Sequence, residues 1–129
     1  MFKIRSEFTA ALVKLLSEMV AIGERPVIDY VLRSPEEQFR LYAKGRVKVG
    51  DVWVENNKFQ IVTQLDGFNK KSNHNRALAA DIYFSDKNGN VIFNWSRGKS
   101  EYWHKRWQDL GGQPIIMFAD GSIDAPHFD

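Results

Sequence analysis

The sequence contains no cysteine among its 129 residues. Thiol nucleophiles, disulfides and cysteine-based zinc sites are therefore excluded, and any metal ion must be held by histidines and carboxylates. Long apolar runs are also absent, since no stretch approaches the roughly 20 apolar residues of a membrane span. Near the N-terminus, Glu7, Lys14 and Glu18 interrupt the apolar core that a signal peptide would require. We therefore expect a soluble chain with no export signal and no membrane partner.

A strong excess of charge of either sign is likewise missing. The formal net charge is +2, from 18 Lys and Arg against 16 Asp and Glu, and the two signs are mixed along the chain. This pattern predicts an ordinary surface and no nucleic-acid partner, although a mildly basic protein can approach an anionic cell wall. Most of the 4 Trp and 9 Phe fall on predicted apolar faces, which favours the core over base stacking.

Apolar residues recur at helical and strand spacings along the whole chain, with no repeat or linker between them. Ser34 followed by Pro35 and two glutamates is typical of a helix start, and Gly23 and Gly45 are typical of helix ends. A flap or an irregular hairpin is expected within residues 47–67, with Asn56 and Asn57 between its two alternating segments. The remaining predictions are helices over residues 6–22, 35–44 and 99–110, and strands over 27–32, 79–84, 91–95 and a buried 115–118. Together they predict one α+β domain over residues 1–129, with an antiparallel sheet and flanking helices.

One segment, residues 72–81, carries a pattern typical of metal chemistry. His74 and Asp81 are seven positions apart, and imidazole nitrogen and carboxylate oxygen are ordinary ligands of a catalytic zinc ion. Such a site uses three protein ligands and keeps one position open for water. Only two further histidines, His104 and His127, can supply the third ligand.

Each of these histidines follows an acid by three positions. Glu101 and His104 would share one face of a predicted helix. Asp124 and His127 flank Pro126, which excludes a regular helix and leaves an extended or turn conformation. In that second pair the carboxylate could accept a proton from water while the histidine holds the metal. Spacing alone leaves both pairs open.

Residues 72–81 resemble the S-x-H-x-x-G-x-A-x-D motif of the zinc D-alanyl-D-alanine carboxypeptidases and L-alanyl-D-glutamate endopeptidases. This VanY-like group includes many phage endolysins. Ala77 stands where the motif has Gly. Residues 124–128 resemble the acid-x-P-H-F ending of the group, and residues 32–45 resemble its R-S-x-x-x-Q and L-Y-x-x-G segment. The three matches occur in the family order.

The resemblance implies a role for each matching position. One zinc ion would be bound by His74, Asp81 and His127, with Asp124 as the general base. Arg33 would face the substrate carbonyl or carboxylate and steady negative charge, while Gln38 and Ser72 would line the site. The Glu101 and His104 pair is then interpreted as a surface pair on its helix, and the Asp86, Asn88 and Asn90 segment as a hairpin turn rather than part of a calcium loop.

The expected function is that of a phage endolysin. We expect a monomer that stays in the host cytoplasm until its release and then cuts the L-alanyl-D-glutamate bond of peptidoglycan stem peptides. A D-Ala-D-Ala carboxypeptidase of the same family is one alternative. A non-catalytic cell-wall-binding or phage structural protein is the other.

Overall fold

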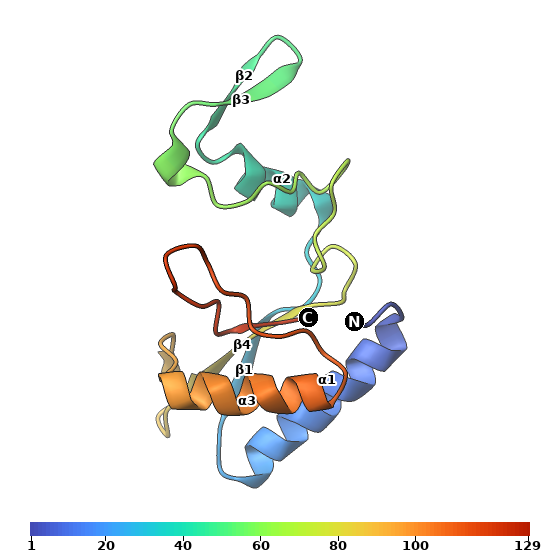
Figure 1. The fold of residues 1–129 in the computed structure, drawn as a ribbon, viewed down its shortest axis with the longest axis vertical. Helices are drawn as coiled ribbons and strands as arrows, with labels where there is room; N and C mark the ends of the chain where they lie inside the picture. Colours follow the sequence, from blue (N-terminus) through green and yellow to red (C-terminus); the bar gives the residue numbers. More distant parts are fainter.

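Three α-helices and two antiparallel sheets make up the regular structure of residues 1–129 in the computed structural model (Figure 1). The predicted α+β class is confirmed. None of the helices combines the length and apolar character needed to cross a bilayer. The elements in chain order are α1 (Arg5–Ala21), β1 (Pro26–Tyr30), α2 (Pro35–Ala43), β2 (Arg46–Val49), β3 (Val52–Glu55), the 3-10 helix η1 (Lys58–Gln60), β4 (Ala80–Ser85), β5 (Val91–Ile92), α3 (Arg97–Asp109) and β6 (His127–Phe128).

Strand β4 is the centre of the larger sheet, where it pairs antiparallel with β1, β5 and β6. Its side chains alternate between the two faces of the sheet, as the pleat of a strand requires. Ala80, Ile82 and Phe84 are buried, whereas Asp81 and Tyr83 face the opposite side. One strand therefore supplies the core on one face and polar groups on the other.

The core lies between this apolar face and the helices α1 and α3, in the lower part of Figure 1. Trp107 is fully buried and makes edge-to-face contacts with Phe8 of α1 and Phe128 of β6. Both helices begin and end within about two residues of their predicted limits. Ser96 caps α3 by accepting a hydrogen bond from the Lys99 amide.

The second part of the molecule consists of α2, the β2–β3 hairpin and η1, which stand apart from the core layers in Figure 1. As predicted, α2 begins at Pro35, and Ser34 accepts a hydrogen bond from the Glu37 amide. The hairpin packs on α2 through an edge-to-face contact between Trp53 and Phe39. Gln38 and Leu41 of α2 line a cleft that Asp81 and Tyr83, on the polar face of β4, also line.

The predicted position of the hairpin turn was wrong. The β2–β3 hairpin turns at Gly50 and Asp51, where Gly50 has a φ of 61° that suits glycine. The prediction placed Asn56 and Asn57 between the two alternating segments. Asn57 instead starts η1, because its side chain accepts a hydrogen bond from the Phe59 amide.

The buried strand predicted over residues 115–118 does not form. Ile116, Met117 and Phe118 are exposed, and the segment makes a single β-bridge, between Met117 and Ile123. The turn at Asp120 and Gly121 folds this segment back on itself, so it has no neighbouring strand of the main sheet. Several other aromatic side chains are also exposed, namely Phe59, Phe68, Phe93 and Tyr102, although most aromatics were expected in the core.

Candidate metal centre

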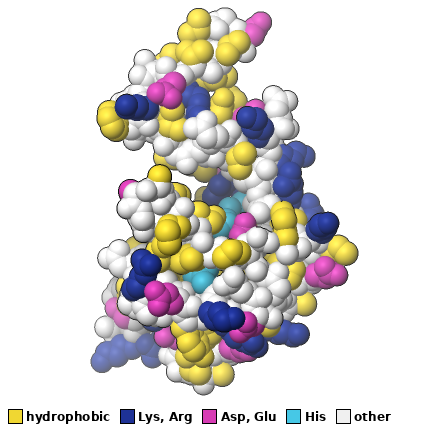
Figure 2. Space-filling view, in the orientation of Figure 1, with side chains coloured by type: hydrophobic (Ala, Val, Ile, Leu, Met, Phe, Trp, Pro, Cys, Tyr) yellow, Lys and Arg dark blue, Asp and Glu magenta, His cyan; other side chains and the backbone are white.

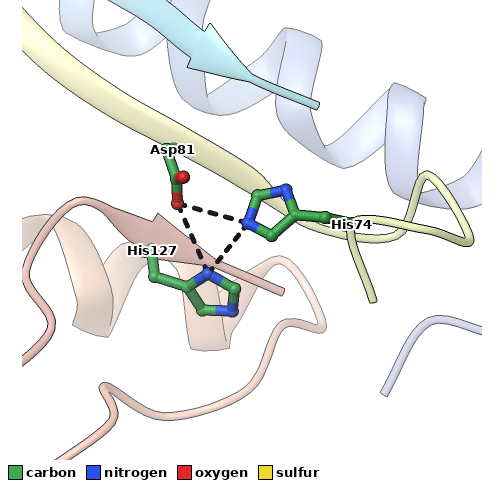
Figure 3. Close-up of side chains that lie close together, drawn as sticks. All are labelled: His74, Asp81 and His127. Carbon is green, nitrogen blue, oxygen red and sulfur yellow. Dashed lines mark hydrogen bonds and ion pairs between the residues drawn. The ribbon is translucent and has the colours of Figure 1, made fainter. Parts of the chain in front are cut away.

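Three side chains far apart in the sequence meet on the polar face of β4 (Figure 3). Asp81 comes from β4 itself, and the pairing of β4 with β6 places His127 opposite it. His74 comes from the turn that precedes β4. His74 Nε2 lies 3.3 Å from Asp81 Oδ1 and 3.3 Å from His127 Nδ1, and His127 Nδ1 lies 3.4 Å from Asp81 Oδ1. The three predicted ligands therefore form a group that could hold one metal ion.

The ring of His74 is oriented by a hydrogen bond to the main chain. Its Nδ1 atom lies 3.3 Å from the carbonyl oxygen of Val31, so it can donate a proton there. The lone pair of Nε2 is then directed at the other two ligand atoms. Such a contact on the outer nitrogen is the usual way that proteins fix the tautomer of a metal-binding histidine.

His127 has an equivalent partner in Asp129, which the sequence analysis missed. The outer nitrogen Nε2 of His127 lies 3.5 Å from Asp129 Oδ2, which also accepts a hydrogen bond of 2.9 Å from Asn73. The main-chain oxygen of Asp129 accepts hydrogen bonds from the Trp107 indole and the Gln113 amide. The position of Asp129 two residues after His127 was the available clue, because alternate residues of an extended chain share a side.

Replacing Asp129 by Asn should weaken metal binding without removing a ligand. The substitution takes away the charge that holds His127, and the loss of such outer partners typically costs about 10- to 100-fold in metal affinity. Competition with a chromophoric chelator, with Zn²⁺ as the probe, measures the change. The control is Asp109→Asn, because Asp109 is a surface acid paired with Lys105. Equal affinities in the two variants would contradict the role of Asp129.

The ionisable side chains of the metal centre shift one another's pKa values. Burial lowers the pKa of His127, but the carboxylates of Asp129 and Asp81 outweigh it and raise that pKa to about 9. Burial raises the pKa of Asp81, yet hydrogen bonds from His127 and His74 hold it well below its usual range. Without a metal, His127 therefore carries a proton at neutral pH. A metal ion must displace this proton, so metal affinity should fall as the pH is lowered below about 9.

The metal-binding group lies at the base of an open cleft of about 370 Å³. Figure 2 shows this hollow between the two parts of the molecule, with histidine atoms visible inside it. All of the other predicted site residues line the same cleft, together with groups that were not predicted. The predicted ones are Arg33, Gln38, Ser72 and Asp124; the others are Leu41, Lys44, Val62, Thr63, Tyr83 and Pro126.

Asp124 lines the cleft but does not belong to the group of three potential ligands. Burial raises its pKa, His127 opposes this shift, and the negative charge of Asp81 adds to it. A carboxylate with a raised pKa is a better proton acceptor than an ordinary surface acid. This position and environment are suitable for a general base.

Arg33 is held by a network on the other wall of the cleft. Its Nη1 donates a hydrogen bond of 3.0 Å to Gln38 Oε1, which lies 3.3 Å from Ser72 Oγ. Gln38 is only 1% exposed, and its amide nitrogen donates to the carbonyl oxygen of Leu65. Arg33 Nε is buried without a protein partner. The hydrogen bond to the buried Gln38 therefore positions the guanidinium group, while its Nε has no protein partner.

His104 lies outside the metal centre. Its Nε2 atom is 2.7 Å from the carbonyl oxygen of Ala125, and its ring stacks on Phe128 at 4.2 Å. Burial lowers the pKa of His104, which keeps the ring neutral and able to donate this hydrogen bond. Glu101 is exposed and pairs with Arg97. The Glu101 and His104 alternative is therefore wrong, and so is the interpretation of His104 as a surface residue.

The segment from Asp86 to Asn90 forms a hairpin turn, as predicted. Asp86 Oδ1 accepts hydrogen bonds from the main-chain amides of Asn88 and Asn90. Gly89 between them has a φ of 85°, which favours glycine. The carboxylate of Asp86 is thus used within the turn.

Ala77, which stands at the Gly position of the resembled motif, has a strained backbone. It is the one residue other than glycine with a positive φ, 55°, and it closes the turn between His74 and β4. Hydrogen bonds from the Ala77 amide to His74 and from the Leu78 amide to Asn73 hold this conformation. The turn that presents His74 therefore requires a left-handed residue.

Ala77→Gly should raise the free energy of unfolding by about 0.5–1 kcal/mol. The left-handed conformation costs an L-residue about 1–2 kcal/mol, and the greater freedom of glycine in the unfolded chain offsets part of that gain. Urea titration followed by circular dichroism measures the difference. The matched control is Ala10→Gly in the exposed face of α1, which should lower stability by about 1 kcal/mol. Destabilisation by both changes would contradict the strain at Ala77.

No protein-family model matches this chain, and no curated protein matches its sequence.

Proposed function

We propose that this protein is a zinc-dependent peptidase that cuts the L-alanyl-D-glutamate bond in peptidoglycan stem peptides. The observation that carries the proposal is the convergence of His74, Asp81 and His127 at the base of an open cleft. Support for the bond and the polymer comes from the resemblance of three chain segments to the VanY-like peptidases. A phage endolysin of this kind would remain in the host cytoplasm as a monomer until its release to the wall.

Zinc is favoured by both the donor types and their spacing. Two imidazole nitrogens and one carboxylate oxygen form a typical set for a catalytic zinc. Ligands placed tetrahedrally at zinc distances of about 2.0–2.1 Å lie about 3.3–3.4 Å from one another. The three separations at this centre are 3.3, 3.3 and 3.4 Å. The residues present therefore fit one zinc ion.

The other residues of the cleft would each have a separate role in hydrolysis. A zinc ion at this centre supplies Lewis acidity, which polarises a carbonyl group and makes water acidic near neutral pH. Asp124 accepts the proton of the attacking water and returns it to the amine that leaves. Arg33 stabilises the negative charge that develops on the carbonyl oxygen, and Gln38 keeps its guanidinium group in place.

Mass spectrometry of digested peptidoglycan tests the proposal. Purified wall material incubated with the zinc-loaded protein should yield stem peptides with a new N-terminal D-glutamate and glycan strands whose muramic acid groups keep only L-alanine. Release of terminal D-alanine alone would replace the proposal by the carboxypeptidase alternative. An unchanged digest with stoichiometric zinc bound would contradict both and favour a non-catalytic protein.

A further inference from the structure

Tyr83 is a cleft residue that the proposed mechanism does not use. It follows Asp81 by two positions on β4, so both side chains lie on the same face of the sheet. Their neighbours Ile82 and Phe84 point into the core on the other face. Tyr83 lines the same cleft as the candidate ligands and Asp124.

Both the backbone and the ring of Tyr83 make contacts that restrict its position. Its backbone pairs with Val27 of β1, and the preceding amide, of Ile82, donates a hydrogen bond of 2.9 Å to the carbonyl oxygen of Pro126. The Tyr83 ring makes an edge-to-face contact with Phe93, with the ring centres 5.1 Å apart. The side chain is therefore held by the sheet and by Phe93, as a preorganised donor requires.

The chemistry of this group complements that of its surroundings. A phenol has an ordinary pKa of about 10 and is an uncharged O–H donor at neutral pH. Residues two apart on a strand are separated by about 7 Å, and a tyrosine side chain extends further from the strand than an aspartate. Both side chains line the same cleft. Arg33, which precedes α2, also lines this cleft.

We propose that the Tyr83 hydroxyl is a catalytic donor that hydrogen-bonds the carbonyl oxygen of the scissile peptide as it becomes negatively charged. The inference rests on the proposed peptidase function. Arg33 and Tyr83 then stabilise the developing charge from two sides of the cleft. The substrate class that this arrangement takes is a peptide whose scissile carbonyl lies between α2 and β4.

Tyr83→Phe tests the proposal because it removes the hydroxyl and keeps the ring against Phe93. We expect kcat to fall by about 10²-fold, the usual effect of losing one such donor, with KM, zinc content and Tm near their native values. A phosphinate peptide that mimics the tetrahedral transition state should bind this variant about 10²-fold more weakly, as measured by calorimetry. Tyr102→Phe, at an exposed position on α3, is the control and should change neither value.

The outcomes separate this inference from the proposed function. Native kcat and native phosphinate affinity in Tyr83→Phe, beside an active wild-type protein, would overturn the role of Tyr83 alone. A loss confined to KM would also overturn it, because it would indicate ground-state binding. If the zinc-loaded wild-type protein hydrolyses no peptidoglycan, this result would contradict both the proposed function and the catalytic role of Tyr83.

Discussion

His127→Ala should leave the protein without bound zinc after dialysis and without peptidase activity. Binding free energies for four-ligand zinc sites of about 10–16 kcal/mol correspond to a loss of about 10²- to 10³-fold in affinity per ligand. The change also leaves Asp81 with one imidazole partner in place of two. Zinc per protein chain, determined by elemental analysis, and release of wall peptides measure the two effects. His74→Ala and Asp81→Ala should behave alike.

The matched control for this prediction is His104→Gln. His104 bonds Ala125 and stacks on Phe128, so its replacement should lower Tm while zinc stays near one ion per chain. Glutamine keeps a side-chain N–H that can reach the same carbonyl oxygen. Zinc lost from the His104 variant and retained by the His127 variant would contradict the assignment of ligands.

Asp124→Asn should reduce turnover by about 10²- to 10⁴-fold, the usual contribution of a positioned general base, with zinc content nearly unchanged. Asparagine keeps the size of the side chain and removes its basicity. Because burial raises the pKa of Asp124, the native rate should decline as the pH falls through that raised value. The acid limb of the pH–rate profile should be missing in the variant. Steady-state kinetics on isolated stem peptides across the pH range provide both measurements.

Asp120→Asn is the control for the change at Asp124. Asp120 is exposed and accepts hydrogen bonds from Ser122 in the nearby turn, so its substitution should leave turnover and zinc content unchanged. Full activity of Asp124→Asn would exclude Asp124 as the base. Loss of zinc as complete as in His127→Ala would make Asp124 a ligand and leave the base unidentified.

The sequence was sufficient to predict the three helices and the strand that carries Asp81, because each depends on local spacing and on caps such as Ser34. It also predicted the group of three candidate ligands, but only through the resemblance. Spacing alone could not separate His104 from His127, since the choice depends on the pairing of β4 with β6. That contact joins residues more than 40 positions apart and has no local pattern.

Other features escaped the sequence analysis for physical reasons. Ile116, Met117 and Phe118 form an apolar run like that of a buried strand, yet the turn after them leaves them exposed. Asp129 orients His127 through a contact that no motif describes. Tyr83 follows Asp81 by two positions, so its place on the polar face of β4 could have been inferred from the sequence. Its place in the cleft could not, because the cleft is also lined by residues of α2.

A crystal structure of the zinc-loaded protein, with anomalous data at the zinc edge, tests the central claim most directly. We predict one anomalous peak per chain, bonded to His74 Nε2, Asp81 Oδ1 and His127 Nδ1 at about 2.0–2.2 Å and open to the cleft on its fourth side. A peak at any other group of side chains, or no peak at stoichiometric zinc, would contradict the account.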